Sequence, residues 1–205
     1  MSVMPTRDRQ AERREATRRE IVDAAWDIAR RDGLAAVTLR EVAARIGMRS
    51  PSLYTHFESK NAIYDAMFGQ AWSEYLQVCE GIEPSIPKQV RKALLVMVST
   101  FVEFALADQA RFQLMNQRMV VDFEPTPQSY APSLQVMALF RKRLALIGVA
   151  ADADADLCVA IVGGLIDAQL ANDPGGQRWI RQLPRAMDMF ADEVRLPGPR
   201  LRRKR

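Results

Sequence analysis

Apolar residues recur at helical spacing along most of the chain, and no segment alternates apolar and polar positions as a half-buried strand does. The breaks fall at glycine, proline and short polar clusters, which commonly end helices. The pattern therefore predicts an all-α protein of about nine helices. The expected helices cover 15–31, 38–46, 50–57, 60–80, 88–107, a shorter one from 108, 132–147, 154–172 and a last segment kinked or restarted at residue 184.

The clearest local signals begin at Thr38. Thr38 and Glu41 have the spacing of a capping box, so the threonine hydroxyl is expected to accept the amide proton of residue 41. Gly47 is expected to end this helix, because glycine adopts the left-handed conformation of a C-terminal cap. A second helix should follow, with Ser50 as its cap and Pro51 at its first position.

The second helix is barely two turns long. Leu53 and Phe57 stand four residues apart and can face inward. Such a short helix is not stable alone, so its outer face needs a use or a partner. Helix, glycine-containing turn and helix is the helix-turn-helix pattern, whose second helix enters the major groove of DNA. An ordinary helical hairpin in an all-α domain has the same spacing.

The residue identities favour the DNA-binding interpretation. The run G-x-x-x-P-S-L-Y-x-H-F-x-x-K, from Gly47 to Lys60, strongly resembles the TetR (tetracycline-repressor-like) family of bacterial transcription regulators. Pro51 and Thr55 depart from the residues that many members carry, which affects base preference rather than fold. The resemblance covers roughly the first 70 residues and continues upstream through Ile21, Ala25, Gly33, Thr38, Val42 and Ala43.

The resemblance implies a homodimeric repressor on a palindromic operator, released when a small ligand binds a pocket enclosed by the middle helices. It also implies that the last two helices pair with those of a second copy. By resemblance and exposure, phosphate contacts are expected from Thr38, Tyr54, His56 and Lys60. Contacts with base edges or nearby backbone are expected from Arg40, Arg49, Ser50, Pro51, Ser52 and Thr55.

Charge is distributed unevenly along the chain. Residues 1–60 carry a net charge of +3, residues 61–197 carry −4 and residues 198–205 carry +5. A basic start and an acidic middle fit a DNA-binding head on a body that does not bind DNA, although charges that solvate helix faces would look the same in the middle. The expected organisation is a flexible basic arm at 1–14, a helix-turn-helix domain at 15–62, an effector-binding and dimerisation domain at 63–196 and a basic, disordered tail at 197–205.

The body holds more aromatic and methionine side chains than the small head needs. A mostly apolar ligand pocket is therefore predicted, with plain core packing as the alternative for each residue. Its expected wall is Trp72, Tyr75, Phe101, Phe104, Phe112, Met115, Asn116, Met119 and Phe140, with Glu103 and Asp167 as further polar candidates. The expected dimer interface combines a small-residue face with a terminal apolar stripe: Ala160, Gly164, Ala168, Met187 and Phe190.

The sequence gives no support for an enzyme. Its one histidine, His56, lies in the DNA motif, and no glycine-rich phosphate loop or H-E-x-x-H is present. The aspartates at 152, 154 and 156 lack the glycine and glutamate of an EF-hand loop and suit a helix start. No metal and no cofactor are predicted. A ligand-independent structural DNA-binding protein and a nucleic-acid-modifying enzyme are the alternatives.

The compartment is predicted from cysteines and hydropathy. Cys79 and Cys158 make no C-x-x-C motif, which favours a reducing cytosol. The arginine-rich start has no apolar signal region, and the longest uncharged apolar run, 157–166, is shorter than the ~20 residues that span a bilayer. We expect a cytoplasmic protein, associated with the nucleoid when it is bound to DNA, without a membrane partner.

Overall fold

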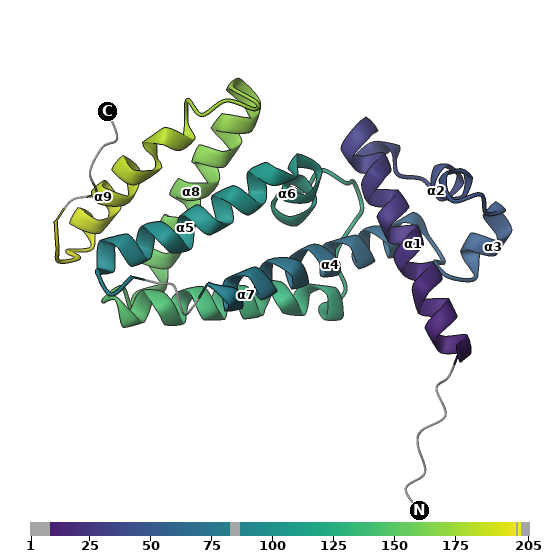
Figure 1. Ribbon diagram of the computed structural model, residues 1–205, viewed down its shortest axis with the longest axis horizontal. Coiled ribbons are helices and arrows are strands. Elements are labelled where there is room, and N and C mark those ends of the chain that lie inside the picture. Colours follow the sequence, from purple (N-terminus) through teal and green to yellow (C-terminus); the bar gives the residue numbers. More distant parts are fainter. Residues whose placement is uncertain (1–8, 83–86, 200, 202–205) are drawn as a thin grey trace, which may run out of the picture.

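The computed structural model describes residues 9–82, 87–199 and 201, and every regular element in that part is helical. Helices α1 to α3 form a head at one end, and α4 runs from it along α7 toward α5, α8 and α9 at the other end (Figure 1). The elements are α1 (Arg9–Asp32), η1 (Leu34–Ala36), α2 (Leu39–Arg45), α3 (Ser50–Tyr54), α4 (Lys60–Gly81), α5 (Val90–Ala107), α6 (Gln109–Asn116), α7 (Pro127–Leu146), α8 (Asp152–Asn172), η3 (Ile180–Gln182) and α9 (Leu183–Glu193).

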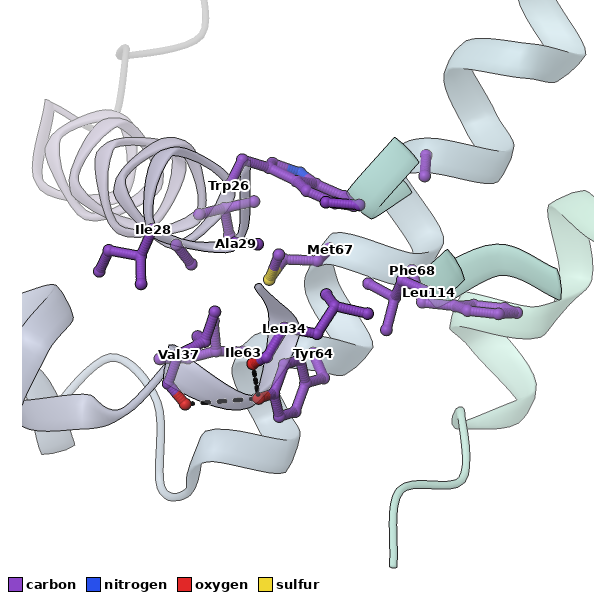
Figure 2. Close-up of a cluster of buried hydrophobic side chains, with 14 of the residues drawn as sticks. Trp26, Ile28, Ala29, Leu34, Val37, Ile63, Tyr64, Met67, Phe68 and Leu114 are labelled. Atoms are coloured by element: carbon purple, nitrogen blue, oxygen red, sulfur yellow. Dashed lines mark hydrogen bonds between the residues drawn. The ribbon is translucent and has the colours of Figure 1, made fainter. Parts of the chain in front are cut away.

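The core of the head lies between α1 and the first half of α4 (Figure 2). The Tyr64 hydroxyl donates to the Leu34 carbonyl over 2.6 Å, which ties α4 to the chain just before α2. Trp26 and Gln70 join α1 to α4 through an indole N–H that donates over 3.0 Å. The same apolar cluster continues past residue 63 into α4, α6 and α7, so the head and the middle of the molecule share one core.

The crossing of α4 and α7 is close. An added Cβ at Gly69 would lie 3.1 Å from Ser129 Oγ, so glycine permits this approach. Asp65 accepts hydrogen bonds from the Thr126 amide and hydroxyl and from the Ser129 hydroxyl, at 2.6, 3.0 and 2.7 Å. A carboxylate at a helix N-terminus is favoured by the helix dipole, so Asp65 fixes the start of α7 against α4.

A second apolar cluster joins α5, α8 and α9. Within it Arg91 is 7 % exposed and pairs with Asp188 and Asp192 at 3.3 and 2.6 Å, and it also donates to the Leu196 carbonyl. Multiple bonds to one guanidinium offset its desolvation. This set holds the end of α9 against α5.

Two helices, α1 and α7, begin earlier in the chain than the sequence predicts. The predicted arm 1–14 is helical from Arg9, because the stretch before Glu15 holds good helix formers and no breaker, although it has no apolar stripe. The loop predicted over residues 122–132 ends earlier, since α7 begins at Pro127 with Thr126 as its cap. Pro132 lies inside this helix, one turn after its start. Residues 1–8 of the predicted arm lie outside the described residues.

The predicted disordered tail is also corrected in part. The Leu201 amide donates to both carboxylate oxygens of Asp188 at 3.0 and 2.9 Å, and its side chain packs on the second cluster. Leu201 is an apolar residue within the basic run, and burial of its side chain explains why this part of the tail packs against the second apolar cluster. The predicted disorder of residues 200 and 202–205 concerns positions outside the described residues.

The three aspartates after residue 151 stand where a helix begins, as expected. Asp152 and Asp154 occupy the first turn of α8, and Arg141 pairs with Asp152 and Asp156, both at 3.1 Å. In the described ranges, no group of three His, Cys, Asp or Glu side chains could hold a metal ion. No helix in the described part has the length and apolar character to cross a bilayer.

Candidate functional site

The helix-turn-helix forms with the predicted caps except one. The Thr38 hydroxyl accepts the Glu41 amide over 3.1 Å, and Gly47 has a φ of 66°, the left-handed value of a C-terminal cap. Helix α3 begins at Ser50, so its cap position is Arg49, without a side-chain hydrogen bond, and not Ser50. A shift of one residue at a helix end leaves the faces of the helix unchanged.

Helix α3 has a buried side and an exposed side. Leu53 and Phe57 are 0 % and 2 % exposed and belong to the core of the head. The polar side is open to solvent. Among the residues predicted to contact DNA, seven in or next to the helix-turn-helix are exposed and Ser50 and His56 are half-buried; the exposed ones are Thr38, Arg40, Arg49, Pro51, Ser52, Tyr54 and Thr55.

Helix α1 holds the end of α3 in place. Arg18 donates to the His56 carbonyl, and its guanidinium carbon lies 4.1 Å from the centroid of the Phe57 ring. A cation over an aromatic face is attractive, so the contact fixes α3 from behind. The His56 Nδ1 atom is buried without a hydrogen-bond partner among the described residues.

Lys60 is exposed at the first position of α4. The Ser59 hydroxyl accepts the Ala62 amide over 3.1 Å and caps this helix, as the sequence predicted. The start of α4 thus presents a lysine charge at the positive end of a helix dipole, which suits a phosphate.

The sequence interpretation missed a polar recess beside α3. It has a volume of about 430 Å³ and lies between the first turns of α1 and the end of α3. Its walls are Gln10, Arg13, Arg14, Thr17, Thr55 and His56. Arg13 and Arg14 fall in the stretch that the sequence predicts as a flexible arm, whereas in the structure they continue α1 and so reach this recess.

An apolar cavity of about 120 Å³ lies in the body, among α4, α5, α7 and α8. Five of the nine predicted wall residues line it: Trp72, Tyr75, Phe101, Asn116 and Phe140. The sequence interpretation missed Cys79, Ile82, Met97, Val98, Val136, Met137, Leu139, Arg143, Cys158, Val159 and Val162. The helical period of apolar residues predicts which side chains are buried, but it does not predict which of the buried side chains line a cavity.

The other four predicted wall residues lie elsewhere. Phe104 packs under Arg111, whose guanidinium carbon is 3.6 Å from the ring centroid. Phe112 and Met115 are buried in the two apolar clusters, and Met119 is 57 % exposed. All four lie between Phe101 and α7, a stretch from which only Asn116, among the predicted wall residues, borders the cavity.

The polar candidates are likewise divided. Asn116 lines the cavity, whereas Glu103 is exposed and Asp167 accepts a hydrogen bond from Gln117 over 2.8 Å. Arg143 is the cation that the sequence did not single out: it is 7 % exposed and donates to the Cys79 carbonyl over 2.9 Å.

The thiols in the wall are held neutral. Burial raises the pKa of the Cys158 thiol to about 12 and also raises the pKa of Cys79. Burial raises the pKa of the Tyr75 hydroxyl as well. The apolar surroundings disfavour the charged form of each group, so the cavity wall carries no negative charge from them at neutral pH.

The residues predicted for the dimer interface fall into two groups. Ala160 and Gly164 are exposed on α8, and Ala168 is half-buried. Met187 and Phe190 are 0 % and 2 % exposed within the protomer, so they cannot form an interface with a second copy in this conformation. The apolar stripe of α9 covers α5 and α8 of its own chain instead.

The head matches a known family. Residues 21–67 match the family described as bacterial regulatory proteins, tetR family. A comparison with curated protein sequences gave no match.

Solved structures share this fold over most of the chain. A protein of unknown function from Rhodococcus sp. RHA1 is 20 % identical, with a TM-score of 0.72 over 86 % of this chain and 94 % of that one. A TetR/AcrR-family transcriptional regulator from Thermobifida fusca YX-ER1 is 16 % identical, with a TM-score of 0.61 over 85 % and 96 %. The transcriptional regulator FadR from Bacillus subtilis, solved with stearoyl-CoA, is 11 % identical, with a TM-score of 0.63 over 84 % and 96 %.

Proposed function

We propose that this chain, which belongs to the tetR family of bacterial regulatory proteins, is a homodimeric transcriptional repressor of the cytoplasm. It binds a palindromic operator through α3 and is released by a small, mostly apolar ligand in the body. One observation carries the proposal. Helix α4 begins at exposed Lys60 beside α3 and contributes Trp72, Tyr75 and Cys79 to the cavity wall.

DNA binding is supported by the exposed side of α3. Arg49, Ser52 and Thr55 are exposed on a helix whose other side is fixed in the core. Arginine is the side chain that most often reads guanine, and hydroxyls bond to bases or phosphates. Thr55 also donates to the Ser52 carbonyl over 2.7 Å, so its oxygen is oriented in advance as an acceptor.

Dimerisation is supported by the exposed side of α8. An added Cβ at Gly163 or Gly164 would meet nothing within 4 Å, so packing inside the protomer does not require either glycine. Each costs ~1 kcal/mol in a helix interior relative to alanine. A partner helix that approaches closely would offset that cost. Leu157 on α8 and Met189 on α9, 44 % and 64 % exposed, add apolar surface for the same contact.

A dimer also explains how a helix as short as α3 can recognise an operator, because two copies bind the same DNA molecule. Two copies of α3 in a two-fold dimer reach adjacent major grooves when their centres lie about 34 Å apart. The operator should then be an inverted repeat, because a two-fold protein matches a two-fold site.

Ligand control is supported by the position of the cavity. Helix α4 links its wall to Lys60, and Asp65 and Ser129 join α4 to α7, which supplies the wall on the other side. A ligand that binds one head spacing better than the other shifts the affinity for DNA, and DNA shifts the affinity for that ligand by the same factor. FadR from Bacillus subtilis, a transcriptional regulator of similar fold, was solved in complex with stearoyl-CoA, a ligand whose acyl chain is apolar.

Selection of bound duplexes from a random DNA pool tests the proposal. The expected result is an enriched inverted repeat, followed by release of that duplex when compounds are screened against the complex. An unenriched pool would contradict sequence-specific regulation. An enriched repeat without any releasing compound would leave a ligand-independent DNA-binding protein.

A further inference from the structure

One side of α1 changes from apolar to basic toward its N-terminus. From Ile21 to Ala29 that side is buried in the core of the head. Thr17 stands four residues before Ile21 and therefore lies on the same side. Residues at the spacing i, i+3, i+4 and i+7 continue this side beyond the core: Gln10, Arg13, Arg14 and Thr17. Figure 1 shows these first turns of α1 extending past α2 and α3.

The end of α3 forms the opposite wall. Thr55 and His56 line the recess of about 430 Å³ together with the four residues of α1. Arg18 joins the two walls, because it donates from α1 to the His56 carbonyl. Thr55 is exposed and belongs to the polar side of α3, so the recess is continuous with the side proposed to read DNA. One water takes ~30 Å³ of the liquid, so the recess admits a hydrated anionic group.

Two arginines give the recess its charge. Among the described residues that line it, Arg13 and Arg14 carry a positive charge and none is acidic. Both are exposed, and neither guanidinium pairs with a carboxylate in the described part of the chain, whereas Arg30 pairs with Asp108 at 2.8 Å. A guanidinium binds phosphate oxygens through parallel N–H donors. An anion in the recess would also offset the repulsion between the two neighbouring cations.

We propose that the recess binds a backbone phosphate of DNA, with Arg13 and Arg14 donating to it from α1 while Thr55 and His56 flank it from α3. The proposal rests on the proposed function, since DNA is the partner, and it adds α1 to the DNA interface. His56 is half-buried and lines the recess, so it approaches the backbone from there and not from the exposed side of α3. A phosphate contact positions the protein without reading sequence, so α1 fixes the orientation of α3 on the duplex.

Fluorescence anisotropy of the full chain over a range of salt concentrations tests the proposal. The probes are the duplex selected from a random pool and a duplex of random sequence. The double variant Arg13→Gln/Arg14→Gln removes two charges, and glutamine favours a helix as arginine does. The slope of log affinity against log salt should fall in magnitude by about two per protomer on both duplexes, because each phosphate contact contributes about 0.9. The affinity ratio between the duplexes should stay the same.

Two further variants serve as controls. Arg13→Lys/Arg14→Lys keeps both charges and should keep the salt slope. Arg19→Gln removes one exposed charge from the same helix, about 180° from Gln10 and outside the recess, and should leave the slope unchanged. If Arg13→Gln/Arg14→Gln loses helical circular dichroism, the two single variants decide, each with an expected decrease of about one. A decrease no larger than that of Arg19→Gln would overturn the proposal.

The two duplexes separate this proposal from the proposed function. An enriched repeat with an unchanged slope in the variant would overturn the recess contact and leave the proposed function standing. A pool without enrichment would contradict sequence-specific regulation, yet a lowered slope on the random duplex would still support the recess. Wild type that binds neither duplex would overturn both. Inorganic phosphate that binds wild type in calorimetry, with no slope change on DNA, would assign the recess to a free anion and overturn the DNA contact.

Discussion

Tyr64→Phe removes one oxygen from the core of the head and should destabilise the whole protein. Tyr64 is 1 % exposed, and its hydroxyl donates to the Leu34 carbonyl over 2.6 Å. The Val37 carbonyl lies 3.4 Å from the same oxygen, so the single hydroxyl proton serves Leu34 (Figure 2). The Leu34 carbonyl also accepts the Val37 amide, so it keeps one bond after the substitution.

The magnitude follows from those contacts. Loss of a buried partner costs about 1–3 kcal/mol, and the remaining bond to Leu34 places Tyr64→Phe in the lower half of that range, about 1–2 kcal/mol. For a chain of this length the change corresponds to about 2–8 °C in Tm. The rings of Phe and Tyr have equal shape, so the contact with Phe123 at 5.7 Å between centroids is retained.

Urea unfolding followed by circular dichroism measures the difference, at one fixed protomer concentration because a dimer unfolds in a concentration-dependent way. Tyr54→Phe is the matched control: Tyr54 is 55 % exposed and should change stability by less than ~0.5 kcal/mol. Equal stability of Tyr64→Phe and wild type would refute the claim that this bond ties α4 to the segment before α2.

Three further predictions concern phosphate contact, dimerisation and alkaline stability. Lys60→Ala should weaken binding to all duplexes alike and lower the salt slope by about one per protomer, whereas a changed site preference would show that Lys60 reads bases. Gly164→Glu should give folded monomers in sedimentation, since nothing in the protomer lies within 4 Å of the added Cβ, and a dimer that persists would exclude α8 from the interface. The pKa of Cys158 is raised by burial to about 12, so its stabilising effect is complete below pH ~9 and is lost as pH rises toward 12. Cys158→Ala should therefore lose less stability than wild type between pH 9 and 11 in urea titrations, and an identical loss would contradict this.

The parts of the helix-turn-helix that depend on neighbouring residues could be predicted. The Thr38 cap, the left-handed Gly47 and the buried pair Leu53 and Phe57 are all confirmed. Each depends on backbone geometry or on the 3.6-residue period, which operate over a few positions. Local sequence is sufficient for such features.

The errors concern partners distant in sequence. Three prolines predict a loop up to residue 132, five residues beyond the observed start of α7. Asp65, more than 60 residues away in the sequence, accepts hydrogen bonds at that helix start. The apolar stripe predicted at Met187 and Phe190 is confirmed, but it packs within the protomer and not against a second copy. A period identifies which face is buried, and it does not identify what covers that face.

The burial of Arg143 in the cavity wall likewise depends on residues distant in sequence. Arg143 follows Arg141 and Lys142, and the run resembles a solvated basic patch. The structure exposes the first two and buries the third against the Cys79 carbonyl. Only the packing of α7 on α4 distinguishes them, because the three differ in helical direction by 100° steps and the sequence does not state where α4 lies.

The central claim is that the exposed side of α3 reads DNA. Fluorescence anisotropy of the selected duplex and of a scrambled duplex tests it with wild type and a variant in which Arg49, Ser52 and Thr55 are all alanine. These side chains are exposed, so the variant should fold. Wild type should prefer the selected duplex by about 10³-fold or more, and the variant should lose most of that preference while it retains phosphate-driven affinity for both duplexes. A folded variant that keeps the full preference would contradict the account.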